Sequence, residues 1–177
     1  MKKILFFLFA GLLIPYYLLA QDIPDATGWG GARWGMMENE LKDIFNDRIV
    51  RSKERQYIDG KKLYRDLEIT KYAINNIEFK VLFEMGSNDN KLKRVRLVYQ
   101  SAIPSQFSEF EQLLSSKYGS PMQKDESGSR SGSDKNSSWF LPSTKIELVY
   151  TAVPRFFTIM NIIYTDRAYL KGDLDKL

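Results

Sequence analysis

Alternation of apolar and polar side chains over residues 77–85 is the feature that most constrains how this chain folds. Successive side chains of a β-strand point to opposite faces, so apolar residues at every second position predict a strand with one buried face. Extended segments precede and follow it, over 63–74 and 92–100, with turn signals at 75–76 and 86–90. This order predicts an antiparallel meander. The alternating apolar residues are Ile77, Phe79, Val81, Phe83 and Met85.

Two helices are predicted beside these strands. The first covers about residues 37–46, with Leu41 and Phe45 at helical spacing, but Met37 stands where Ser or Thr would cap the free N–H groups. The second begins at Pro104, and Gly119 after it favours a helix end. Its apolar stripe consists of Phe107, Phe110, Leu114 and Tyr118.

Residues 122–138 are rich in Ser and Gly and lack apolar periodicity, which predicts a mobile loop. Extended patterns over 138–141, 145–151 and 156–164 follow it. A helix and about three strands therefore occur twice, over 37–100 and over 104–165. This repetition is one of pattern and not of residue identity, so it leaves open whether the chain contains a structural duplication.

These elements predict an α+β fold, an antiparallel sheet with two helices packed on one face. The alternation and the helical stripe also predict which side chains form the core. We expect burial of Phe79, Val81, Phe83, Leu97, Phe110, Leu114, Ile146 and Leu148.

The first 20 residues have the pattern of a signal peptide. Lys2 and Lys3 precede an apolar run that ends at Ala20, which predicts cleavage before Gln21 and a single domain over 21–177. The alternative is an uncleaved membrane anchor, because the run is close to the lower limit of spanning length. Export predicts a periplasmic or secreted protein with no nucleic-acid partner and no membrane span after cleavage.

The chain contains no Cys and no His. It therefore lacks thiol nucleophiles, thiolate or imidazole metal ligands and His-based catalytic triads. The acidic pairs are explained by solvated termini, a helix N-terminus and loop solubility. We accordingly expect no catalytic residues, no metal and no cofactor, and a protein that is not an enzyme.

Positive charge is concentrated in two parts of the sequence. Residues 48–71 contain eight basic and four acidic side chains, and four more basic residues lie between 91 and 96. On a strand, Arg94 and Arg96 share the face opposite Val95, so the solvent side of the meander is predicted to be basic. Such a surface attracts an acidic protein or anionic lipid headgroups, unless its charges are ordinary solvated sheet residues. The candidate binding residues of this basic part of the meander are Lys80, Lys93, Arg94 and Arg96.

Trp29 is a further candidate binding residue. It stands between glycines near the predicted mature N-terminus and is the tryptophan expected to be exposed, whereas Trp34 and Trp139 are expected in the core. An exposed indole ring can bind a sugar ring by apolar contact, so an apolar groove at Trp29 would favour a carbohydrate- or lipid-headgroup-binding protein.

The run Arg33-Trp34-Gly35-Met36 before an acidic helix, the later Lys117-Tyr118-Gly119-Ser120-Pro121 and a strand with Trp139 together resemble a group of exported bacterial proteins of unknown function. More distantly, the helix entry is similar to that of the SmpA/OmlA (BamE-like) outer-membrane assembly proteins, and the tandem helix-plus-meander order resembles beta-lactamase inhibitor proteins. These relatives are non-catalytic protein binders, and the resemblance implies the same role here. The acylated Cys of the outer-membrane assembly proteins is absent.

We therefore expect a non-catalytic cell-envelope protein that binds another protein. The alternative is a periplasmic protein that binds carbohydrate or an anionic lipid headgroup.

Overall fold

The computed structural model describes residues 24–129 and 132–174, so the predicted signal peptide over 1–20 lies outside the described residues. Three α-helices, one 3-10 helix and ten strands make up this part of the chain. In chain order they are β1 (Gly28–Trp29), β2 (Ala32–Arg33), α1 (Glu38–Phe45), η1 (Asn46–Arg48), β3 (Val50–Ile58), β4 (Leu63–Ile74), β5 (Ile77–Gly86), β6 (Leu92–Gln100), α2 (Pro104–Tyr118), β7 (Gln123–Ser129), β8 (Gly132–Phe140), β9 (Thr144–Val153), β10 (Phe157–Asp166) and α3 (Arg167–Leu174).

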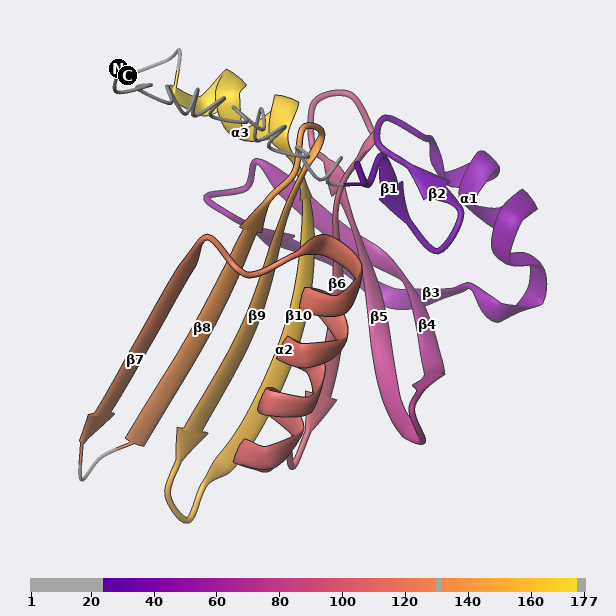
Figure 1. Ribbon diagram of the computed structural model, residues 1–177. Coiled ribbons are helices and arrows are strands. Elements are labelled where there is room, and N and C mark those ends of the chain that lie inside the picture. Colours follow the sequence, from indigo (N-terminus) through magenta and orange to yellow (C-terminus); the bar gives the residue numbers. More distant parts are fainter. Residues whose placement is uncertain (1–23, 130–131, 175–177) are drawn as a thin grey trace, which may run out of the picture.

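Eight of the strands form one antiparallel sheet in the order β3-β4-β5-β6-β10-β9-β8-β7 (Figure 1). β1 and β2 pair separately as a short ribbon. The predicted α+β fold is confirmed. None of the helices in the described part of the chain is long and apolar enough to cross a lipid bilayer.

The element order repeats within the sheet. α1 is followed by β3 to β6, and α2 is followed by β7 to β10, so each half has one helix and four strands. The halves join through their last strands, where Val95 lies opposite Tyr164 and Leu97 opposite Ile162. The prediction of three strands per half is wrong by one in each case. The extra strands, β3 and β7, are the polar sheet edges, where little side-chain surface is buried and apolar alternation is absent.

The prediction of a mobile loop over 122–138 is also wrong, because this stretch contains the strands β7 and β8. β7 and β8 pair along their whole length, from Gln123 opposite Ser138 to Ser129 opposite Gly132. β8 pairs in turn with β9, from Ser133 opposite Ala152 onward. Backbone hydrogen bonds hold these strands, and such bonds do not depend on apolar side chains, so Ser/Gly composition was a poor guide here.

α1 and α2 pack on the same face of the sheet. The Phe45 ring of α1 lies 5.2 Å from that of Phe83, and the Phe110 ring of α2 lies 5.2 Å from that of Phe79. Residues 79 and 83 of β5 share one face because they are four positions apart. All eight predicted core residues are buried, which confirms that part of the prediction.

The two helices begin in the same way. The backbone N–H of Met37 donates to Glu40 Oε2 at 2.7 Å, and that of Ile103 donates to Gln106 Oε1 at 2.9 Å. In both, a side chain three residues inside the helix reaches back to an apolar N-cap residue, as in one half of a capping box. The missing Ser or Thr at Met37 is thus partly compensated. The third helix, α3, was not predicted.

Glu111 connects α2 to the edge hairpin. Its carboxylate accepts hydrogen bonds from Lys124 Nζ of β7 at 2.9 Å and from Ser137 Oγ of β8. Burial raises the pKa of Glu111, but the two hydrogen bonds and the charges of Lys124 and Lys135 together lower it by more, so the pKa lies below its ordinary value. A carboxyl with a depressed folded-state pKa stabilises the fold above its unfolded-state pKa and loses this contribution as the pH falls through the folded-state pKa.

Glu111→Gln is therefore expected to lower stability at neutral pH and to flatten the stability profile between about pH 5 and pH 3. Urea unfolding at a series of pH values measures this. Glu109→Gln, an exposed position on the same helix, is the control. An unchanged acid dependence in Glu111→Gln would contradict the link between α2 and the hairpin.

Candidate functional site

The sheet face opposite α1 and α2 is the first candidate site, and we call it the open face. Strand register places Val98 opposite both Lys80 and Asn161, and places Asn161 opposite Val149. Since Leu97 and Leu148 point into the core, these neighbours point to the open face. Its half-buried aliphatic residues are Leu82, Val98, Val149, Val153, Ile159 and Ile163.

The structure brings Arg94 and Arg96 together on the open face around one carboxylate. Arg94 Nη1 lies 3.2 Å from Glu84 Oε2, and Arg96 Nε lies 3.0 Å from Glu84 Oε1. The Glu84 side chain is 0% exposed, and Arg94 also pairs with Asp59 at 3.1 Å. The two arginines therefore neutralise a buried acid, a structural role that strand alternation did not reveal.

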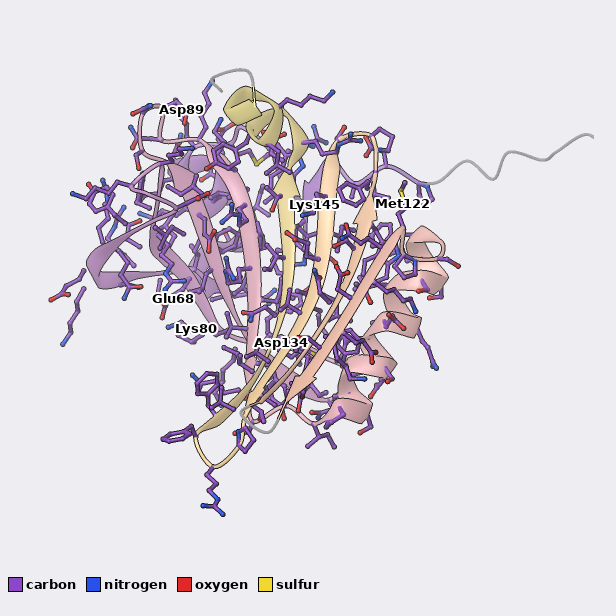
Figure 2. The ribbon with its side chains drawn as sticks, turned by 90° about the vertical axis from the view of Figure 1, so that its left-hand side faces the viewer. Glu68, Lys80, Asp89, Met122, Asp134 and Lys145 are labelled. Atoms are coloured by element: carbon purple, nitrogen blue, oxygen red, sulfur yellow. The ribbon has the colours of Figure 1, made fainter. Side chains whose placement is uncertain are left out.

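The predicted lysines are paired as well. Lys80 Nζ lies 2.8 Å from Glu68 Oε2, and Figure 2 shows these two residues close together. Lys93 Nζ lies 2.8 Å from Asp89 Oδ2. An irregularity in the β5–β6 register between Glu84 and Met85 accompanies Lys93, so it does not follow the simple alternation of β6. The charges expected to attract an anionic partner are thus largely balanced by neighbouring carboxylates.

A groove of about 640 Å³ lies on the first half of the open face. β3 supplies one wall through Ser52 and Gln56, while Lys80, Arg96 and Ile159 lie on the strands beside it. Charged, amide and aliphatic side chains alternate along this surface. The groove suits a ligand with mixed polar and apolar groups.

Two large aromatic side chains are exposed where β9 turns into β10. Phe156 is 83% exposed and Phe157 is 54% exposed. Phe157 lies opposite Val153, so its side chain belongs to the open face. Ile103, 54% exposed, belongs to a neighbouring segment, because the Ser101 N–H donates to the Thr158 carbonyl at 2.9 Å. This end of the sheet therefore exposes apolar surface.

Trp29 is buried, so the prediction that it is exposed is wrong. Trp29 lies on the face of the sheet that the helices cover. Its ring centroid is 4.9 Å from that of Tyr72, and the ring also packs against Phe45 and Phe83. A groove of about 870 Å³ passes it, but Trp29 is only 9% exposed and offers no free ring face to a sugar. The ribbon of β1 and β2 folds it inward, which composition alone did not indicate.

The other two tryptophans have polar partners. Trp139 is buried and its Nε1–H donates to the Gly119 carbonyl at 2.8 Å, as expected of a core residue. Trp34 is half-buried, and its Nε1–H donates to Thr144 Oγ1 at 2.7 Å. Neither arrangement forms a common stacking platform with Trp29.

Metal-ligating side chains do not cluster in threes anywhere in residues 24–129 and 132–174. Comparison of the chain with protein-family models, with curated proteins and with solved structures found no match. The resemblance to exported protein binders therefore stays a prediction.

Proposed function

We propose that this chain is a non-catalytic exported protein that binds a protein partner through the open face, with Phe156 and Phe157 as its apolar anchors. The observation that carries the proposal is the exposure of both phenylalanines beside the open face. Export is inferred from the leader sequence alone.

Exposure of a phenylalanine ring to water is unfavourable in free energy, and a partner that buries the ring removes this penalty. Burying one such side chain contributes about 1.5–3 kcal/mol, and aromatic residues and Arg are enriched at protein interfaces. Arg155 precedes the two phenylalanines in the turn, which supplies both residue types at one point. Neither ring is used in the core of the described chain, so the fold does not require them.

The ion pairs of the open face also favour a protein partner. Arg94, Arg96 and Lys80 are already matched by carboxylates, so these three side chains offer little unpaired charge to an anionic membrane. Alternation of aliphatic residues with paired charges is compatible with an interface that has an apolar centre and a polar rim. We therefore place the anionic-headgroup alternative away from this face.

The double variant Phe156→Ala/Phe157→Ala tests the proposal. Tagged protein is incubated with envelope extract, and bound proteins are quantified by mass spectrometry. Loss of both anchors is expected to lower recovery of the specific partner at least about tenfold, with little change in melting temperature, because the rings are exposed.

The matched control is Ile44→Ala/Leu113→Ala, which removes two exposed apolar side chains from the helices. This variant should keep the partner. Equal recovery by both double variants would refute an anchor role for the phenylalanines, and absence of any specifically enriched protein would refute the proposed function.

A further inference from the structure

A cavity of about 690 Å³ lies beside α3. Figure 1 shows α3 at the end of the sheet opposite the turn between β9 and β10. The walls of the cavity come from β2, the β5–β6 connection, the segment before β9 and α3. Asp89, one of its lining residues, lies at the same end as α3 in Figure 2. The basic side chains that line it are Arg33, Lys91, Lys93, Arg167 and Lys171.

The two carboxylates of this cavity already have partners. Asp89 Oδ2 pairs with Lys93 at 2.8 Å, and its Oδ1 accepts the Lys91 backbone N–H at 3.1 Å. Asp166 Oδ1 accepts the Ala168 N–H at 2.9 Å and so caps the start of α3. Asp89 is thus shared between Lys93 and the nearby Lys91, and Asp166 is engaged at the start of α3, so two carboxylates face five cations in this cavity.

Among the residues that the structure describes, the side chains of Arg33, Lys91 and Lys171 form no hydrogen bond or ion pair, although the charge of Lys91 helps to lower the pKa of Asp89. Arg167 is held by its Nη1–H bond to the Leu141 carbonyl at 2.8 Å. Arg94 and Arg96 differ from these cations, because both pair with the buried carboxylate of Glu84. Positive charge without a carboxylate partner therefore gathers at the α3 end, whereas Arg94 and Arg96 on the open face are balanced by Glu84.

Five basic and two acidic side chains give the lining a formal charge of 5 − 2 = +3. Cations from separate segments repel one another, and a multiply charged anion between them removes this repulsion. A single carboxylate supplies one negative charge, whereas a phosphomonoester supplies about 1.5–2 at neutral pH. Arg33 offers a planar fork that matches phosphate oxygens, and lysines act as point charges around it.

We infer that this cavity binds a ligand carrying a phosphomonoester or a diphosphate, with Arg33, Lys91 and Lys171 as the contacts. The backbone amides at the start of α3 are already paired with Ser143 and Asp166, so side chains supply the recognition. The ligand is a free phosphorylated molecule or the headgroup of a phosphate-bearing lipid. The site is distinct from the phenylalanine anchors of the proposed protein interface, which lie at the other end of the sheet.

Two probes distinguish these sources. Titration calorimetry with sodium pyrophosphate at low ionic strength measures binding of the free anion. Flotation with phosphatidylcholine vesicles, with and without phosphatidic acid, measures binding of the headgroup. Binding in either assay supports the inference, and the assay that responds identifies the source. The absence of binding in both assays overturns it.

The variant Lys91→Gln/Lys171→Gln tests the location of the site. Its affinity for the probe that binds is expected to fall at least tenfold, whereas Lys53→Gln/Arg155→Gln, which also removes two positive charges without a partner among the described residues, should change it less than twofold. The melting temperature of the first variant should stay the same or rise, because mutual repulsion is reduced. An equal fall in both variants would show unspecific attraction and would overturn the inference.

Discussion

Glu84→Ala is expected to lower the free energy of unfolding by about 3–5 kcal/mol, because it leaves two arginines without the buried carboxylate that neutralises them. Glu84 is fully buried and pairs with Arg94 at 3.2 Å and with Arg96 at 3.0 Å. These arginines retain 15% and 24% of their side-chain exposure, so water partly compensates them and the lower end of the range applies. Urea unfolding followed by tryptophan fluorescence measures the loss.

Glu78→Ala is the matched control for this experiment. Glu78 is on the same strand and face, but it is 60% exposed and pairs only with Lys71, at 3.3 Å, among the described side chains. An exposed pair of this kind contributes about 0–1 kcal/mol. A decrease in the free energy of unfolding below about 1 kcal/mol in Glu84→Ala would show that Arg94 and Arg96 do not need Glu84 for neutralisation. The two arginines would then again be candidate binding residues.

Phe110→Ala is expected to lower the free energy of unfolding by a similar amount, about 3–5 kcal/mol, because removal of a large aromatic side chain leaves a cavity in a packed core. Phe110 is 1% exposed, and its ring meets Phe79 edge to face, with centroids 5.2 Å apart. This contact holds α2 against β5, so its loss weakens the attachment of the helix that precedes the second half. Thermal and urea unfolding, monitored by circular dichroism, measure this change in stability.

Leu113→Ala on the same helix is the control, since Leu113 is 40% exposed and loses little burial. We expect a change below about 1 kcal/mol there, because surface substitutions seldom cost more. Similar losses at both positions would mean that α2 does not bury the stripe of Phe107, Phe110, Leu114 and Tyr118.

Strong apolar periodicity made much of the fold predictable. The alternation of β5, β6 and β9 and the stripe of α2 identified all eight predicted core residues, because burial of apolar surface is the dominant favourable contribution to folding. The edge strands β3 and β7 were missed because an edge strand is held by backbone hydrogen bonds and contacts solvent on much of its surface. Polar composition therefore indicated a loop over 122–138 where the structure has a hairpin.

The candidate sites were less predictable than the core. Alternation correctly placed Arg94 and Arg96 on the face away from the core, but it could not show that Glu84 lies between them. The even positions of β5 contain that acid, and only strand pairing brings it opposite Arg94. Trp29 was assigned to the surface because glycines flank it, whereas the β1–β2 ribbon turns it against Phe45 and Tyr72.

The sequence by itself determined the fold class, the main strands and helices, and the absence of Cys and His chemistry, because these depend on residue type and on spacing along the chain. Only the tertiary structure decided which charges are neutralised and which converge on the cavity beside α3. Ion pairing depends on distances of a few ångströms between segments that are far apart in the sequence, and the order of strands in the sheet sets those distances.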